Sequence, residues 1–412
     1  MKTFGIIAEY NPFHNGHRYQ INYAKEALGA DNVVVVMSGD FVQRGEPALI
    51  DKYKRSNIAI SEGADLIIEL PTIAATSSAE IFAESGINLL LSTNIITDIV
   101  FGCEDESPEL FLKIAKLLNE EPPLFKETLD KELRSGKSYA AAKTSALLSV
   151  WEEKEQLPIV SHFFNSPNNL LGIEYTRAIL KRNPSVNIHP LTRVGSSHDD
   201  LKFNGSYASA SFIRNTLLSP GATENDVFSF VPHEELHILK QSIEENTLIS
   251  PNDVSFILHH KLLEQNDLSE ILDCSNELSN RIKNELSSFL SFTQFCDILK
   301  TKNLTHSRIR RVLTHIYLNI KKSQLLTFKD VNYAPYLHVL GFSEKGSSLL
   351  KEIKKNSNNP LFTSPKDINK TLNKNQIEIL TSDLFAADVY RSIMTNKSGT
   401  TFPTEFTRKF MN

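Results

Sequence analysis

The stretch TFGIIAEYNPFHNGHRYQ, residues 3–20, decides the fold, because it joins a short apolar run to a helix through a turn of proline, glycine and histidine. Residues 3–8 are apolar over too few positions for a helix, which predicts a buried strand. Residues 16–28 carry apolar side chains at helical spacing, and Gly29 supplies the stop. The stretch therefore predicts a strand, a turn and a helix, in that order.

The same alternation of strands and helices continues through the first half of the chain. Its clearest member is the run NVVVVM at residues 32–37, which is typical of a fully buried strand. Further strands are expected at 65–70, 97–101 and 186–191, and helices at 48–61, 78–91, 137–151 and from near Asn169. This rhythm implies right-handed crossovers, a mostly parallel sheet and an α/β fold.

The chain changes character after Leu218, where Ser219-Pro220-Gly221 interrupts it. Apolar residues then recur at helical spacing over 252–265, 276–300, 305–321 and 343–355. A chain of 412 residues is longer than one hydrophobic core usually serves. We therefore expect an α/β domain at residues 1–220 and a mostly helical domain at residues 221–412.

Composition excludes several classes of protein. The 41% apolar and 23% charged residues are ordinary for a globular chain, and no apolar run approaches the ~18 residues that span a bilayer. Three cysteines far apart form neither a disulfide framework nor a zinc site, which favours a reduced, cytoplasmic protein. Residues 300–355 hold twelve Lys or Arg and three acidic residues, a charge of +9 in a chain of net −5. Such a segment suits a polyanion.

The histidines of the turn are the main candidates for chemistry. His14, Gly16 and His17 lie where a strand leads into a helix, and helix N-terminal amides favour phosphate oxygens. Gly16 allows a nucleotide to approach the backbone, and two imidazoles three residues apart could donate to an α-phosphate. In an isolated motif, the histidines could equally be caps and turn residues. The chain contains no G-x-x-x-x-G-K-[ST], G-x-G-x-x-G or H-E-x-x-H motif.

Several motifs together resemble one family. They are GIIAEYNPFHNGH, MSGDFVQRGEPALIDKYKRSNIAI, GADLIIELP, FGCE, SPNNLLGIEY and ASFIR. In this order they resemble the bacterial tRNA(Met) cytidine acetate ligases, among the nucleotidyltransferases related to class I aminoacyl-tRNA synthetases. The resemblance weakens after about residue 356, and Asp40 and Arg18-Tyr19-Gln20 depart from the pattern.

The resemblance implies a fold and a reaction. The fold would be a Rossmann-like nucleotidyltransferase domain followed by a helical tRNA-docking domain. ATP would activate acetate as acetyl-adenylate, releasing pyrophosphate. The acetyl group would then pass to the exocyclic amine of the wobble cytidine of elongator tRNA(Met), giving N4-acetylcytidine.

The resemblance also assigns site residues, with His14 and His17 as the catalytic pair. The implied ATP-binding residues are Ile7, Ala8, Glu9, Tyr10, Asn11, Pro12, Phe13, His14, Asn15, Gly16, His17, Arg18, Tyr19, Gln20, Gly102, Asn169, Arg193, Ser211 and Arg214. Arg193 and Arg214 would hold the leaving phosphates. ATP, acetate and the tRNA are the expected partners, with no membrane, protein partner or protein-bound metal; the sequence leaves Mg²⁺ open.

Some candidates have ordinary structural explanations. Arg44 either binds phosphate or tRNA or is a solvated loop charge, and Asn169 either caps a helix or contacts the nucleotide. Lys52 and Arg55, three apart on one helix, could reach phosphate. Cys103 is expected to be a packed thiol rather than a nucleophile.

The basic helix at residues 305–321 is the expected tRNA contact. Its candidate residues are Arg308, Arg310 and Arg311, with Tyr317, Tyr333 and Tyr336 as stacking surfaces for a base. A charge run is as often a solvated face. Two other functions stay open at this level: a small-molecule adenylyl- or cytidylyltransferase, and a non-catalytic RNA-binding protein with a vestigial nucleotide site.

Overall fold

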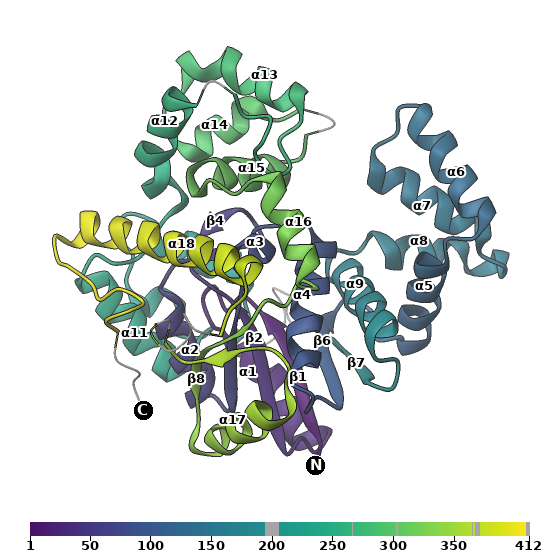
Figure 1. Cartoon of the computed structure of the whole chain (residues 1–412), viewed down its shortest axis with the longest axis horizontal. Helices are drawn as coiled ribbons and strands as arrows, with labels where there is room; N and C mark the ends of the chain where they lie inside the picture. Colours follow the sequence, from purple (N-terminus) through teal and green to yellow (C-terminus); the bar gives the residue numbers. More distant parts are fainter. Residues whose placement is uncertain (194–205, 266, 302–303, 365, 367–370, 409–412) are drawn as a thin grey trace.

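A seven-stranded sheet forms the centre of the computed structural model, which describes residues 1–193, 206–265, 267–301, 304–364, 366 and 371–408 (Figure 1). The strands are β1 (Thr3–Ala8), β2 (Asn32–Ser38), β5 (Leu66–Leu70), β6 (Asp98–Cys103), β7 (Asn187–Thr192), β8 (Leu337–Phe342) and β9 (Leu361–Phe362). Their order is β7-β6-β1-β2-β5-β8-β9. A separate hairpin pairs β3 (Phe41–Val42) with β4 (Glu46–Pro47).

Helices surround the sheet. They are α1 (Asn15–Asn22), α2 (Lys52–Ser61), α3 (Thr72–Ala75), α4 (Ala79–Ser92), α5 (Pro108–Glu120), α6 (Pro123–Arg134), α7 (Tyr139–Val150), α8 (Leu157–Asn165), α9 (Pro167–Arg182), α10 (Ala210–Leu217), α11 (His233–Glu244), α12 (Ser255–Glu264), α13 (Asn276–Glu285), α14 (Phe292–Leu299), α15 (His306–Leu318), α16 (Lys322–Asp330), α17 (Glu344–Asn356) and α18 (Lys374–Ser398). None of the described helices is long and apolar enough to cross a bilayer.

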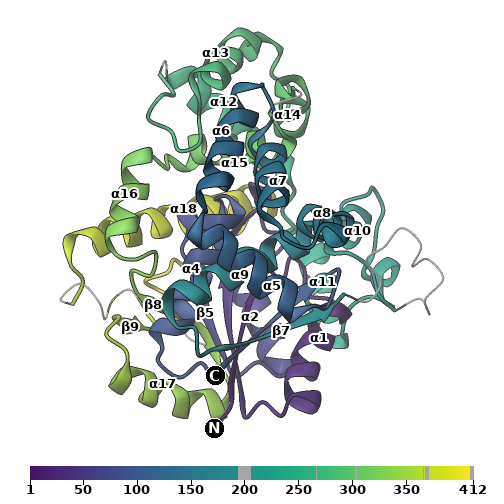
Figure 2. The ribbon, with the colours of Figure 1, turned by 90° about the vertical axis from the view of Figure 1, so that its right-hand side faces the viewer.

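The central strands are buried on both faces, which explains their continuous apolar sequence. In β2, Val34 and Val36 join the core cluster shared with α4 and α9, whereas Val33 and Val35 join the cluster on the face of α1 and α2. Figure 2 shows helices on both sides of the sheet. The alternation of side chains along a strand therefore assigns each residue near the site to one face.

The first half of the chain confirms the predicted α/β rhythm. All five predicted strands are present, and β1, β2, β5, β6 and β7 run parallel. The predicted first helix is α1 followed by a π-helical turn at Tyr23–Ala27.

The second half is not purely helical. Strand β8 pairs antiparallel with β5, and β9 pairs with β8. The sheet therefore crosses the expected domain boundary at residue 220, because strands from 337–362 complete a sheet that begins at residue 3. The helix expected over 276–300 is two helices, α13 and α14, since Ser291 caps a new helix after a short 3₁₀ turn. Helices α12–α15 gather at the top of Figure 1.

Candidate active site

A cavity of about 400 Å³ opens at the carboxyl ends of the parallel strands, a size and place usual for small-molecule sites in α/β folds. Its walls come from β1 and the turn into α1, from the β3–β4 hairpin, from α4 and α9, from the ends of β6 and β7, and from the start of α10.

The two histidines of the turn are held by the backbone. His14 is the N-cap of α1, and its Nδ1 accepts the amide N–H of Gly16 at 3.1 Å. The Nδ1 of His17 accepts the amide N–H of His14 at 3.2 Å. The rings stack with centroids 3.7 Å apart and planes 19° apart. Because both Nδ1 atoms accept hydrogen bonds, each neutral ring carries its proton on Nε2.

Burial keeps both rings neutral. It is the largest cause that lowers the pKa of His14, followed by the charge of Arg193, and the value falls to about 3. Burial, again first, and neighbouring His14 lower the pKa of His17 well below its usual value. The Nε2 of His14 is buried without a hydrogen-bond partner among the described residues. An unpaired buried donor at a helix start, beside the cavity, suits an anionic oxygen.

Two arginines face the same cavity. Arg193 donates to Oδ1 of Asn168 at 2.8 Å and crosses Gly102, where a Cβ would lie 3.1 Å from its Cγ. Arg214 donates to the carbonyl of Asn11 at 2.7 Å and pairs with Glu46 at 3.3 Å. Gly102 therefore leaves room for the Arg193 side chain to lie over the end of β6.

Asn169 lies behind the cavity wall. Its side chain is fully buried, and its Oδ1 accepts the amides of Glu104 and Asp105 at 2.8 and 3.2 Å. Asn168, the residue before it, lines the cavity instead. Asn168 rather than Asn169 thus lines the cavity, because the first turn of α9 directs Asn169 into the loop after β6.

The cavity has two sides, because alternate side chains of β1 point to opposite faces of the sheet. The histidine side lies over α1 and carries His14, His17 and the arginines. The Glu9 side lies over α4 and α9, where Ile7, Phe82, Phe101, Leu171 and Tyr175 belong to the core cluster of that face. Charged groups thus gather on one side, and apolar and aromatic walls on the other.

Most of the expected ATP-binding residues line the cavity. These are Ile7, Ala8, Glu9, Tyr10, Asn11, His14, Gly16, His17, Tyr19, Gln20, Gly102, Arg193, Ser211 and Arg214. Pro12, Phe13, Asn15 and Arg18 lie outside its lining. Phe13 is buried in the core, and Arg18 pairs with Glu62 at 3.0 Å. Residues of one turn point in different directions, so only some of them can face the cavity.

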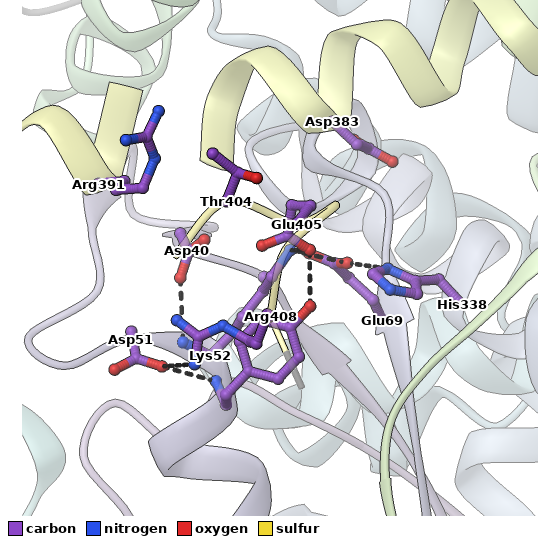
Figure 3. Close-up of polar contacts among 12 residues, drawn as sticks. Asp40, Asp51, Lys52, Glu69, His338, Asp383, Arg391, Thr404, Glu405 and Arg408 are labelled. Atoms are coloured by element: carbon purple, nitrogen blue, oxygen red, sulfur yellow. Dashed lines mark hydrogen bonds and ion pairs between the residues drawn. The ribbon is translucent and has the colours of Figure 1, made fainter. Parts of the chain in front are cut away.

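Lys52 and Arg55 do not reach the cavity, contrary to expectation. Lys52 is buried and pairs with Glu69 at 2.8 Å and with Glu405 at 3.2 Å (Figure 3). Nδ1 of His338, from β8, lies 2.5 Å from Glu69. Arg55 is buried and donates to the backbone carbonyls of Glu9, Ser38, Gly39 and Ile50. Both cations stabilise the fold around the ends of β1, β2 and β5.

The arginines of α15 are also largely tied to the protein. Arg310 pairs with Glu46 at 2.9 Å, and Arg311 lies 3.9 Å from Asp273. Gly45 has φ +72°, and a Cβ there would lie 2.3 Å from the amide nitrogen of Arg311. The hairpin therefore packs against α15. Arg310 and Arg311 take part in contacts within the protein and do not form a free basic face.

The tyrosines expected to stack on a base are not available for it. Tyr317 and Tyr336 are buried in the core.

Cys103 is a buried thiol as expected, and burial is the largest cause that raises its pKa to about 12. Lys302, one of the twelve basic residues, lies outside the described residues.

The sequence analysis missed Glu46 and Asn168. Glu46 lies between Arg214 of the cavity wall and Arg310 of α15, and it forms an ion pair with each. The only sequence signal for Glu46 was its place in the SGDFVQRGEP motif after β2, and for Asn168 its place beside Asn169.

Comparison with known proteins adds independent information. Residues 1–403 match the family described as HIGH Nucleotidyl Transferase. The chain is 38% identical over 399 residues to the tRNA(Met) cytidine acetate ligase of Thermoanaerobacter sp. (strain X514), covering 97% of each chain. It is 36% identical over 374 residues to that of Clostridium novyi (strain NT), covering 90% of this chain and 92% of the relative.

Solved structures agree with the fold. The crystal structure of Thermotoga maritima TmcAL bound with alpha-thio ATP superimposes with a TM-score of 0.88 and 30% identity. The match covers 96% of this chain and 95% of that one.

Proposed function

Because the chain belongs to the tRNA(Met) cytidine acetate ligase family of HIGH nucleotidyl transferases, we propose that its cavity activates acetate with ATP and passes the acetyl group to a cytidine of tRNA(Met). The observation that carries this proposal is the pair of neutral, stacked histidines, of which His14 has a buried Nε2–H donor without a partner among the described residues.

The histidine side suits ATP. The α-phosphate would lie against His14 and His17 at the start of α1, where the helix dipole adds to their donors. The ribose and base would extend over Gly102 toward Arg193, which places Arg193 at the nucleoside rather than at the leaving phosphates expected from the sequence. The β- and γ-phosphates would face Ser211 and Arg214 at the start of α10, where Ser209 caps the helix.

The first step needs positioning and charge stabilisation rather than a covalent enzyme intermediate. An acetate oxygen attacks the α-phosphorus, the bond to the β-phosphate breaks, and pyrophosphate leaves. His14 and His17 stabilise the negative charge that develops on the α-phosphate, and Arg214 stabilises the leaving group. The amine of the cytidine then attacks the acetyl carbon of acetyl-adenylate.

Mg²⁺ would enter with the nucleotide. No group of three or more His, Cys, Asp or Glu side chains gathers as metal ligands in the described part of the chain. The triphosphate itself supplies oxygen ligands that Mg²⁺ prefers. We place the reaction in the cytoplasm, where tRNA is modified.

The tRNA would approach across the hairpin and the start of α15. Arg44 is exposed at the tip of the hairpin and also lines the cavity. Arg308 is half-buried and donates to the carbonyl of Asp273 at 3.3 Å. These two residues are the stronger candidates for phosphate contacts, while Arg310 and Arg311 hold α15 in place.

The test measures acetate-dependent exchange of pyrophosphate into ATP, followed by acetylation of tRNA(Met). We expect wild-type protein to perform both. His17→Ala should lower the exchange rate by ~10²–10³, because it removes a donor aimed at developing charge. His237→Ala, which removes an exposed imidazole on α11 outside the cavity lining, is the matched control and should behave as wild type.

Two results would contradict the proposal. If wild-type protein exchanges pyrophosphate without acetate but with a phosphorylated acceptor, it is a small-molecule nucleotidyltransferase. If His17→Ala keeps a normal rate and native circular dichroism, the histidine pair does not serve the α-phosphate.

A further inference from the structure

Glu9 is a carboxylate in a cavity otherwise suited to phosphate. It follows β1 directly, and its Oε1 accepts the amide N–H of Gln43 at 2.8 Å. No residue in the described part of the chain donates to its other oxygen, Oε2. A carboxylate beside a triphosphate would repel it, so Glu9 must face a part of the substrates that offers hydrogen-bond donors.

Glu9 directly follows β1, so residues from the strands on both sides of β1 surround it. On one side of β1, Gly102 lies in β6 and Arg193 follows β7, whereas Gln43 comes from the β3–β4 hairpin, which follows β2 on the other side. Ile7, two residues before Glu9, packs with the α4 and α9 face, and the charge of Glu9 acts on the phenol of Tyr175 in α9. Glu9 therefore belongs to the aromatic side of the cavity, close to the turn that holds the histidines.

That side has the chemistry of a pocket for a flat base. Phe82 and Tyr175 are 2% and 4% exposed, so their rings form dry walls. Among the substrates of the proposed reaction, cytosine is a planar base with an exocyclic amine, and a carboxylate is the usual acceptor for that amine. Adenine also carries an amine, but its expected place is over Gly102 in β6, the strand beside β1.

Resting on the proposed function, we propose that Glu9 is the catalytic residue of the second step, which binds the cytidine amine and takes its proton. The lone pair of N4 forms a bond with the acetyl carbon. The bond from that carbon to the phosphate oxygen breaks, and AMP leaves with the electron pair. One proton of N4 passes to Oε2 of Glu9. The aromatic side of the cavity is then the acceptor pocket.

The charges around Glu9 fit a proton acceptor. Burial is the largest cause that raises the pKa of Glu9, and the nearby charge of Glu46 also raises it. The Gln43 amide, Arg214 and Arg44 act in the opposite direction. The net pKa lies above that of an exposed glutamate, nearer to neutral pH, where a base is most effective.

The experiment compares the two steps in Glu9→Gln, which keeps the shape and the hydrogen bond from Gln43. Acetate-dependent exchange reports the first step, and single-turnover transfer from preformed acetyl-adenylate to tRNA(Met) reports the second. We expect the ratio of transfer rate to exchange rate to fall by ~10²–10⁴. The wild-type transfer rate should rise with pH and level off as Glu9 ionises, and this rise should disappear in Glu9→Gln.

The controls separate this proposal from the proposed function. Glu153→Gln, which removes a carboxylate outside the cavity paired with Lys113, should leave the ratio unchanged. Glu9→Asp, a base one methylene shorter, should keep the pH-dependent rise at a reduced rate. An unchanged ratio in Glu9→Gln overturns the role of Glu9, as does an equal loss in both steps. If the wild-type protein shows no acetate-dependent pyrophosphate exchange, the proposed function itself is wrong.

Discussion

His14 shows how a single side chain can be both a helix cap and a substrate contact. Its Nδ1 caps α1, so its Nε2–H points away from the cap, where the described protein offers no acceptor. The fold thus stabilises the neutral ring in one tautomer. A hydrogen-bond donor that stays neutral stabilises charge as it develops without attracting other anions.

This arrangement predicts a pH-dependent stability. The unfolded chain binds a proton at His14 below about pH 6.5, whereas the folded protein resists protonation down to about pH 3. The free energy of unfolding therefore falls as pH drops through this window, by about 2 kcal/mol at pH 5 from His14 alone. Urea unfolding at pH 7 and pH 5 measures the loss. His14→Asn, which keeps a capping oxygen but does not titrate, should lose less; an equal loss would contradict the argument.

At the scale of elements, α2 depends on charges brought from distant parts of the chain. Lys52 in its first turn meets Glu69 at the end of β5 and Glu405 near the C-terminus (Figure 3). Lys52 and Glu69 are buried and Glu405 is partly buried, so each relies on the others for solvation. The C-terminal segment is therefore fastened to the sheet by a polar contact rather than by packing alone.

Lys52→Ala should destabilise the protein strongly. Buried Glu69 would lose its lysine and keep only His338, and Glu405 would lose its lysine too; breaking a buried pair typically costs about 3–5 kcal/mol. Arg391→Ala removes a partly exposed pair with Asp388 on α18 and should cost at most about 1 kcal/mol. Urea midpoints of the two variants measure the difference. Similar midpoints would show that the buried cluster adds no more than a surface pair.

The strands of the first half were predictable, whereas the partners of the charged side chains were not. The apolar run at residues 32–37 fits only a buried strand, and its length and hydrophobic pattern were enough to predict that strand. By contrast, β8 is a six-residue segment between helices, and its place in the sheet depends on β5, far away in sequence. Lys52 and Arg310 looked like solvated or phosphate-binding cations because their acidic partners come from other elements. The histidine pair was predictable because its geometry is local.

For the whole molecule, the proposed path of tRNA can be tested by measuring how tRNA affinity depends on salt concentration. Arg44→Ala should weaken tRNA binding and lower the slope of log affinity on log salt by about 0.7–0.9 if it contacts one phosphate. Lys116→Ala, a highly exposed lysine on α5 outside the cavity, serves as the control. Filter binding at several salt concentrations measures both. A slope unchanged from wild type would place the tRNA elsewhere.

The antiparallel pairing of β8 with β5 has a consequence for synthesis in the cell. The backbone amides and carbonyls of Leu66, Ile67 and Ile68 that face β8 have no strand partner until residues 337–342 leave the ribosome. At about 5–20 residues per second, that interval lasts on the order of tens of seconds. During it, the nascent chain presents a hydrophobic strand edge, the kind of surface that pairs with other chains. The newborn protein is thus most prone to aggregate, and most in need of a chaperone, before its own C-terminal strands cover that edge.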